Sequence, residues 1–506
     1  MSTAVASLPV ASVVPGWRLT VERGHAVQRE TECWLFSAEA KALSLDAVER
    51  EQERRGREAD RILLQAHIEA RGTGDVGSAV RVLGTEGAPP RRYVRGHMHE
   101  RHIETVFGRV AVLRRGYEAA GAESIHPLDE ALALPGRSYS HEVQRRLVKA
   151  AVQGPFEEAV ERLEEATGVL VPKRSAEAVV VEAARDVDAF YERRRPPAAA
   201  QTGPIVVGAV DGKGIPMVKP EKALRVVRRG KGKKANKKRM ATVAAVFTQH
   251  PRVRTPEDVV RSLFHPGPRP AGEEPPPAHP RPEHKRVWAS VVKEKEEVIA
   301  EMAAEMRRRD PRGEKRHVVA TDGERALQHG VETALPGVLL VLDFLHVLEY
   351  LWKAAYVFHA EGSPEAAAWV EERALRILRG GVSQVVKGLR QSVTKRGLRG
   401  PRRATLLKVA AYYRRNRHRM RYHEYLAAGL PIASGAVEGA CRNLIKDRME
   451  RSGMRWTLGG AEAMVKLRAT YVSADLDEYW AFHLRQDQDR LHPPGRWEPA
   501  PCSVGK

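Results

Sequence analysis

The 506-residue sequence contains few cysteines and no long apolar run. Its three cysteines, Cys33, Cys441 and Cys502, are odd in number and far apart, which argues against a disulfide framework and a thiolate zinc site. No segment approaches the roughly 20 uninterrupted apolar residues of a membrane-spanning helix. The first residues also lack the basic segment of a secretory signal. We therefore expect a protein of a reducing, intracellular compartment with no membrane partner.

Acidic residues are outnumbered in this chain. It has 85 Lys and Arg against 64 Asp and Glu, a net charge of +21 and a sequence pI of about 10.0. Such an excess predicts a polyanionic partner, above all nucleic acid, and a cytoplasmic, nucleoid-associated location. A membrane surface is the competing interpretation, but no strongly amphipathic basic terminus supports it.

Size and patterning predict several domains. Hydrophobic residues make up 42% of the chain, enough for globular packing, and 506 residues exceed one comfortable core. Helical apolar spacing dominates up to about residue 195, and strand-like runs follow a linker at 196–203. The predicted divisions are 1–90, an N-terminal helical region of unassigned role; 91–195, a helical DNA-binding region with a short hairpin; 204–345, the first part of an α/β core; 346–430, a helical insertion; 431–490, the final core helix with C-terminal helices; and 491–506, a tail.

Three successive helices are predicted in the second of these regions, at residues 140–151, 156–166 and 175–191. Glycine and proline punctuate them, which gives the outline of a helix-turn-helix unit whose last helix would enter a DNA groove. An ordinary helical bundle is the alternative, and the pattern alone favours the bundle.

Three carboxylates are the main chemical signal. Asp211 and Asp322 follow the β-branched runs 205–210 and 317–321, and Glu438 lies on a predicted helix. A strand packed in a sheet has no reason to finish on an exposed acid unless chemistry occurs there. Taken singly, each Asp-Gly pair is a turn signal. Taken together, the three acids favour a site for divalent cations, because carboxylates are the ligands that magnesium prefers.

The predicted order after residue 204 is three strands, a helix, a strand, a helix, a strand, a helical block and a final helix. The first three strands are 205–211, 214–218 and 240–247, and a helix at 283–309 follows a proline-rich loop at 251–282. With acids after the first and fourth strands and on the final helix, this order is the ribonuclease H-like pattern with an all-helical insertion.

Several segments resemble the ISKra family of insertion-sequence transposases, which are DDE enzymes related to the Mutator-like group. They are 210–217 (VDGKGIPM), 321–325 (TDGER), 342–352 (LDFLHVLEYLW) and 435–450 (GAVEGACRNLIKDRME) with 453–456 (GMRW), and the likeness runs from about Arg92 to about Leu491. The resemblance implies an α/β ribonuclease H-like catalytic core with an all-α insertion and a mostly helical N-terminal DNA-binding region. It also implies binding of terminal inverted repeats and metal-dependent cleavage and strand transfer of double-stranded DNA, at transposon ends and target, by a homodimer or larger assembly.

The resemblance further implies two Mg²⁺ ions, for which Mn²⁺ would substitute. Asp211 would bridge both ions, and Asp322 and Glu438 would each complete one site. Two such cations help phosphodiester cleavage by activating the attacking oxygen and neutralising the leaving oxygen. Asp343 and His346 match the Asp-x-x-His signature that Mutator-like enzymes carry after the second acid, which implies a position near the active site. A cap on the next helix is the alternative.

Basic residues around the acids predict contacts with phosphates. Arg442 and Lys446 follow Glu438 at i+4 and i+8, so they share its helix face, although a simple Glu438–Arg442 pair is the alternative. The basic run ends at Trp456, a ring capable of stacking, and another dense run lies between the first strands. The predicted DNA-binding residues are Lys213, Lys231, Lys233, Lys234, Lys237, Lys238, Arg239, Arg442, Lys446, Arg448, Arg451, Arg455 and Trp456.

Two other functions compete with the transposase. One is a non-catalytic, sequence-specific DNA-binding protein. The less favoured one is a single-strand nuclease with a tyrosine nucleophile, which would use His97 and His99 with Tyr117, Tyr139 or Tyr191. That site needs a central strand to aim both imidazoles at one metal, whereas the residues around His97 predict a loop.

Overall fold

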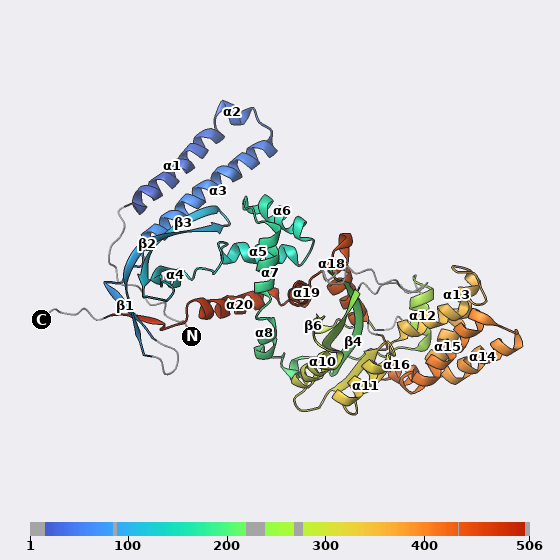
Figure 1. The fold of residues 1–506 in the computed structure, drawn as a ribbon. Helices are drawn as coiled ribbons and strands as arrows, with labels where there is room; N and C mark the ends of the chain where they lie inside the picture. Colours follow the sequence, from blue (N-terminus) through green and yellow to red (C-terminus); the bar gives the residue numbers. More distant parts are fainter. Residues whose placement is uncertain (1–15, 84–88, 219–237, 268–276, 434, 501–506) are drawn as a thin grey trace, which may run out of the picture. The chain divides into compact units, whose positions relative to one another are not determined.

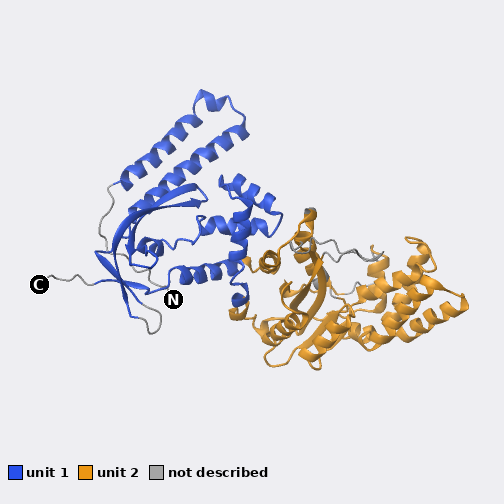
Figure 2. Cartoon of the chain, viewed as in Figure 1, with its two compact units in different colours: residues 1–190, 477–506 blue, residues 191–476 orange. Residues whose placement is uncertain are grey.

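The chain forms two compact units, which are described separately (Figure 2). Unit 1 comprises residues 1–190 and 477–506, and unit 2 comprises residues 191–476. The computed structural model describes residues 16–83, 89–218, 238–267, 277–433 and 435–500, with the backbone alone at 436–438 and 452. Within these residues, no helix is both long and apolar enough to cross a membrane.

Unit 1 contains a pair of long helices and an antiparallel sheet (Figure 1). Helices α1 (Trp17–Leu35) and α3 (Leu45–Ala70), joined through α2 (Ala38–Lys41), pack on each other. The strand order is β3-β2-β1-β9, with β1 (Ala79–Val82), β2 (Arg91–Thr105), β3 (Gly108–Glu118) and β9 (Trp497–Pro499). The predicted short hairpin is therefore a long ribbon of β2 and β3, and the predicted tail contributes a strand.

The remaining helices of unit 1 follow the ribbon. They are α4 (Pro127–Ala131), α5 (His141–Ala151), α6 (Phe156–Thr167), α7 (Lys173–Ala183) and α8 (Val187–Arg193), together with α20 (Leu476–Leu491), and α8 and α20 each cross a unit boundary. The helix predicted at 175–191 is thus two helices. Asp186 lies at the break, where it accepts hydrogen bonds from Arg490 of α20. Helices α5, α6 and α7 contact one another, as both a helix-turn-helix unit and a small bundle require.

Unit 2 is built on a five-stranded mixed sheet. Its order is β6-β5-β4-β7-β8, with β4 (Ile205–Pro216), β5 (Lys238–Gln249), β6 (Glu283–Ser290), β7 (Arg316–Thr321) and β8 (Leu339–Leu342). The first three strands pair antiparallel, whereas β4, β7 and β8 run parallel. The carboxyl ends of these three parallel strands therefore lie at one edge of the sheet.

Different helices cover the two faces of this sheet. On one face, α10 (Lys295–Arg309) packs against β4 and β5, with α11 (Arg325–Ala334) beside it. Gly208 permits this close approach, because a Cβ there would lie 2.7 Å from the sulfur of Met306. The opposite face shares one apolar core with the helical insertion. The insertion consists of α12 (Phe344–Ala355), α13 (Pro364–Leu378), α14 (Val382–Lys395), α15 (Gly400–Asn416) and α16 (Tyr422–Ala427).

Three element predictions in unit 2 are wrong. The segment predicted as the start of a helix at residue 283 is the edge strand β6, whose run from Val287 to Ser290 is buried in the sheet. The second predicted strand, 214–218, is not separate, because β4 continues through Pro216 while it stays paired with β5. The proline-rich loop contains helix α9 (Pro256–Phe264), which begins with a capping box at Thr255.

Candidate active site

Asp211 and Asp322 stand in register on neighbouring parallel strands. Strands β4 and β7 pair from Ile205 with Arg316 to Ala209 with Ala320, an offset of 111 residues at both ends. The same offset leads from Asp211 to Asp322, two positions beyond the last pair. Because alternate residues of a strand share a face, both acids lie on the face that the helical insertion covers.

Asp211 does not end its strand, as the sequence had suggested. It lies inside β4, at the point where β4 extends beyond β7 but remains paired with β5. Its side chain is half-buried rather than exposed. Oδ1 accepts a hydrogen bond of 2.7 Å from the backbone N–H of Gly212, and Oδ2 accepts one of 3.2 Å from the thiol of Cys441. The acid is therefore held in place from both sides.

Asp322 follows β7 directly and starts a tight turn. Its Oδ1 accepts a hydrogen bond of 2.8 Å from the backbone N–H of Glu324, and Gly323 adopts a φ of +89°, which favours glycine. Burial raises the pKa of the Asp322 carboxyl above its ordinary value. The Glu324 N–H opposes this rise, and the negative charge of Asp211 adds to it. Asp211 is therefore close enough for its charge to act on Asp322.

Tyrosines of the helical insertion fix the backbone at this edge of the sheet. The hydroxyl of Tyr412 in α15 donates a hydrogen bond of 2.7 Å to the carbonyl of Asp322. The hydroxyl of Tyr422 in α16 donates one of 2.7 Å to the carbonyl of Leu342, at the end of β8. The ring of Tyr412 also stacks on Tyr350, with 4.0 Å between the ring centroids. The insertion thus positions the loops that carry the acids, a role that the sequence did not suggest.

The segment that bears Glu438 packs against the strand of Asp211. Helix α17 (Gly435–Ala440) contacts β4 and β5, and a π-helical stretch (Cys441–Lys446) and α18 (Asp447–Met449) continue it. The side chain of Glu438 is outside the described residues, but its backbone lies one turn before Cys441, whose sulfur meets Asp211. Segments 227 residues apart in sequence, at 211 and 438, are therefore neighbours in unit 2.

The π-helical stretch changes the prediction for this segment. With more than 3.6 residues per turn, it shifts the spacing that would have kept Glu438, Arg442 and Lys446 on one face. Arg442 and Lys446 are nevertheless exposed. The predicted helix of Glu438 is therefore not one continuous α-helix, and the prediction that Glu438, Arg442 and Lys446 are aligned on one face at i, i+4 and i+8 is wrong.

Asp343 and His346 have different roles in the structure. Strands β7 and β8 pair with an offset of 21 residues, from Val318 with Leu339 to Thr321 with Leu342. The same offset leads from Asp322 to Asp343, so Asp343 follows β8 as Asp322 follows β7. It is fully buried and caps α12, accepting a hydrogen bond of 2.7 Å from the backbone N–H of Leu345. The positive charge of His346 lowers the pKa of Asp322 against the stronger effect of burial. Asp343 therefore fits the capping alternative, and His346 lies beside the acids.

Two predicted DNA contacts are buried in the core instead. Arg448 is 0% exposed and lies over the ring of Trp456, 4.9 Å from its centroid. The indole N–H of Trp456 donates a hydrogen bond of 3.0 Å to the carbonyl of Met449, and the ring is 7% exposed. Neither side chain is exposed to a phosphate or a base, so the structure does not place these two residues at a DNA-binding surface.

The other predicted DNA-binding residues are distributed as follows. Arg239, Arg442, Lys446, Arg451 and Arg455 are exposed, and Lys213 is half-buried beside Asp211 on β4. Lys238 is exposed and pairs with Glu450 at 2.6 Å. Residues Lys231, Lys233, Lys234 and Lys237 lie outside the described residues. Backbone bonds between Pro216 and Trp456 and between Val218 and Trp456 keep the end of β4 beside residues 451–456.

His97 and His99 lie in unit 1, within strand β2 rather than in a loop. That prediction of a loop is wrong, because the residues pair with β3 around a bulge between Arg95 and Met98. The ring of His99 packs edge-on against His126, with 5.1 Å between centroids. Tyr117 is fully buried, and its hydroxyl bonds to Gly77, so it cannot serve as an exposed nucleophile. Tyr191 is also buried, and its hydroxyl bonds to Asp475, so neither of these two tyrosines is accessible as a nucleophile.

No group of three or more His, Cys, Asp and Glu among the described side chains is arranged to hold a metal ion. No protein-family model matches the chain, and no curated protein matches it.

Proposed function

We propose that the chain is a DDE transposase of an insertion sequence, with unit 2 as a ribonuclease H-like catalytic core interrupted by a helical insertion. It binds the terminal inverted repeats of its element, cleaves DNA there and joins the freed 3′ end to target DNA. The proposal rests on the motif resemblance to the ISKra family and on the structural argument that follows. Pairing two ends requires at least a homodimer on DNA.

One observation carries the proposal: the shared register of Asp211 and Asp322 at the carboxyl edge of two parallel strands. In an open α/β sheet, this edge is where ligands bind. Placing two half-buried carboxylates near each other is unfavourable, since each opposes ionisation of the other. A purely structural role would not need this arrangement, whereas a cation site does.

The residues present fit a divalent cation. Asp211 and Asp322 offer hard carboxylate oxygens on one face of the sheet. Burial raises the pKa of Asp322 and the charge of Asp211 adds to the rise, and a cation would offset both effects. They would hold Mg²⁺ or Mn²⁺ with Glu438, whose helix packs beside them. When bound, such ions supply charge stabilisation for the attacking and leaving oxygens. The chain itself orients the acids through Cys441, Gly212 and Tyr412.

Exposed cations supply the contact with the DNA backbone. Arg442 and Lys446 project from the segment that carries Glu438, and Arg451 and Arg455 follow them beside the end of β4. Guanidinium and ammonium groups bind phosphate oxygens and fix the register of the duplex without reading its sequence. The scissile strand would therefore lie along this segment.

The decisive experiment compares Asp211→Asn with Glu361→Gln. Glu361 is an exposed acid of the same unit, in the turn before α13. In a magnesium-dependent cleavage and strand-transfer assay on element ends, Asp211→Asn should abolish products, while Glu361→Gln should match the parent chain. Both variants should bind the DNA. If Asp211→Asn gave the same products as the parent chain, the proposal that the chain is an enzyme would be refuted.

The non-catalytic DNA-binding protein is the second candidate, favoured only by the charge of +21. It predicts binding of element ends by the parent chain with no magnesium-dependent product at all. The same assay therefore separates the two functions.

A further inference from the structure

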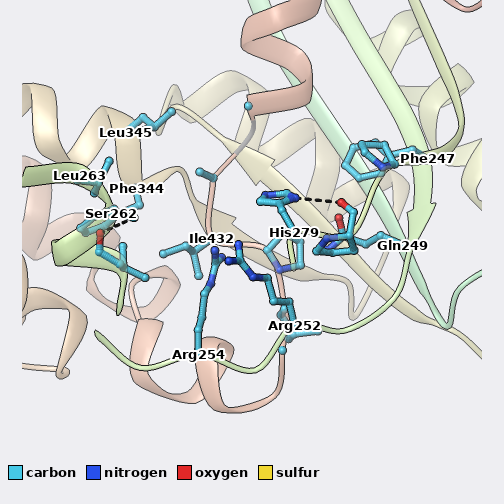
Figure 3. A pocket seen from close by; sticks show the side chains of 18 of the residues that line it. Phe247, Gln249, Arg252, Arg254, Ser262, Leu263, His279, Phe344, Leu345 and Ile432 are labelled. Atoms are coloured by element: carbon cyan, nitrogen blue, oxygen red, sulfur yellow. Dashed lines mark hydrogen bonds between the residues drawn. The ribbon is translucent and has the colours of Figure 1, made fainter. Parts of the chain in front are cut away.

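A cavity of about 470 Å³ lies in unit 2, apart from the carboxylates (Figure 3). It is enclosed by the end of β5, helix α9, the start of α12 and the turn after α16. This volume falls within the range of roughly 300–1,000 Å³ of small-molecule sites. It is far larger than a water molecule or a lone inorganic anion needs.

The cavity lining is basic. Arg252, Arg254 and Lys285 line it together with His279, and none of the described lining residues is an Asp or Glu. Among the described residues, no ion pair engages the guanidinium of Arg252 or of Arg254. Figure 3 shows the two arginine side chains extending toward one another, below His279. Asp258 is an acid near Arg254, but it does not line the cavity, whose own lining carries only positive charge. Such a lining is typical of a site for an anion.

Arg254 is poorly satisfied in the protein alone. Its Nε is buried and has no hydrogen-bond partner within the described structure. Burial lowers the pKa of its guanidinium, and the neighbouring charge of Arg252 lowers it further, against a smaller opposing effect of Asp258. Leaving a charged donor buried without a partner is unfavourable, so a bound acceptor would stabilise it. Arg252 is already oriented, since its Nε donates a hydrogen bond of 2.7 Å to the carbonyl of Pro277.

The backbone presents both arginines on one side. Residues 252–254 run along the turn after α16, where the N–H of Arg252 bonds to Gly429 and that of Arg254 bonds to Leu426. Val253 between them is exposed, whereas both arginines line the cavity. A Cβ at Gly429 would lie 2.7 Å from Pro251, so the close approach of the two segments depends on glycine.

The rest of the cavity is mainly apolar, with Gln249 and Ser262 as polar residues. Leu263 and Leu345 lie on one side of it and Ile432 nearer the arginines (Figure 3), and Pro280 and Pro282 also line it. An arginine pair that binds a phosphate next to an apolar wall and an imidazole ring matches the two halves of a nucleotide. The cavity also adjoins the candidate active site through the chain, because Phe344 follows Asp343 and Gly435 begins the helix of Glu438.

From these features we infer that the cavity binds a nucleotide, with its phosphate on Arg252 and Arg254 and its base against Leu345, Ile432 and His279. The ligand is either a free mononucleotide or a single unpaired nucleotide displaced from a DNA duplex. The nucleotide chemistry stands on the cavity alone, whereas the DNA source rests on the proposed function.

The test is a titration of the full-length protein with dTMP, inorganic phosphate and thymidine. We expect dTMP to bind more tightly than either fragment. The double variant R252A/R254A should weaken dTMP binding by roughly tenfold or more, as expected when charged hydrogen-bond donors are removed. The control K387A/R390A removes the same charge from exposed positions of α14 and should leave the affinity unchanged. Equal binding of thymidine and dTMP, or no effect of R252A/R254A, would overturn the inference.

Two further measurements keep this test decisive. If circular dichroism shows that R252A/R254A is misfolded, Arg254→Lys replaces it, because it keeps the charge but loses the planar fork and should bind dTMP several-fold more weakly. A duplex with one bulged 2-aminopurine nucleotide then identifies the source. If this duplex competes with dTMP, the nucleotide in the cavity comes from DNA. If it does not compete, the DNA source is excluded and a free mononucleotide is the ligand. Asp211→Asn should retain dTMP binding. The strand-transfer assay therefore tests the proposed function, and the dTMP titration tests the nucleotide site separately.

Discussion

The thiol of Cys441 donates a hydrogen bond of 3.2 Å to Oδ2 of Asp211, across 230 positions of sequence. The contact joins the strand of the first acid to the segment that carries Glu438. Cys441 is buried, whereas Cys33 is exposed in unit 1. A residue that looked chemically idle in the sequence therefore lies against the central carboxylate of the candidate active site.

Cys441→Ala removes this donor from Asp211. Because one hydrogen bond to a carboxylate positions the acid, we expect DNA cleavage to slow by up to about tenfold, with DNA binding unchanged. Cys33→Ala should have no effect on the rate. Equal rates for Cys441→Ala and the parent chain would show that the thiol does not position the acid.

Gly323→Ala should destabilise unit 2 more than Gly362→Ala does. Both glycines have positive φ, +89° and +79°, so both substitutions introduce similar backbone strain. Only at Gly323 would the new Cβ meet a neighbour, the ring of Tyr412 at 2.8 Å, whereas Gly362 faces open space. We expect a difference of about 1–3 kcal/mol in the free energy of unfolding, measured by urea titration. Equal losses would mean that the Tyr412 ring moves freely.

Tyr412→Phe leaves the carbonyl of Asp322 without its hydroxyl partner. The expected loss is about 1 kcal/mol in the free energy of unfolding. The matched control is Tyr356→Phe, at an exposed tyrosine 40% accessible to solvent. Hydrogen exchange at residues 322–324 should also quicken in Tyr412→Phe alone, and an unchanged exchange rate there would contradict the positioning role.

Asp186 should make the stability of unit 1 depend on pH below about 4. Burial alone would raise its pKa, but hydrogen bonds from His483 and Arg490 outweigh burial and lower the pKa to about 2. A carboxyl whose pKa is lowered by folding stabilises the fold at pH values above its unfolded-state pKa, ordinarily 3.8. That stabilisation is lost as the pH falls from about 4 toward 2. The stabilisation at stake is roughly 2 kcal/mol.

Asp186→Asn should therefore flatten the acid dependence of unit 1. Hydrogen exchange in α20 between pH 5 and pH 2.5 would measure it. Asp489→Asn changes an exposed acid of the same helix and should behave as the parent chain does. An identical acid dependence in Asp186→Asn and the parent would refute the role of this carboxyl.

Arg442→Ala and Lys446→Ala together should reduce the salt dependence of DNA binding. For each phosphate that the protein no longer neutralises, the slope of log affinity against log salt becomes shallower by about 0.9. Arg316→Ala provides the comparison, because Arg316 is exposed at the start of β7, at the other end of the strand from Asp322. A slope unchanged by the double substitution would place the DNA elsewhere.

Strands rich in Val and Ala were predictable where they were buried along their whole length. The runs before Asp211 and Asp322 are strands because β-branched residues suit a packed sheet. The strand β6 was missed because Val287 and Val291 have a spacing that also fits a helix, and only packing on α10 and α19 (Leu458–Val472) decides between them. The π-helical stretch was missed because no local composition signals it.

The sequence by itself determined the basic charge, the small number of cysteines, and the acids at Asp211 and Asp322 with their glycines. These are properties of composition and of a few neighbouring residues. The tertiary structure decided which distant groups meet: the register of the two acids, the contact from Cys441, the tyrosine hydroxyls, and the cavity that Arg252 and Arg254 share with Leu345 and Ile432. Such contacts depend on chain topology, because residues 80 to 230 positions apart become neighbours only when the sheet and its helical insertion are packed.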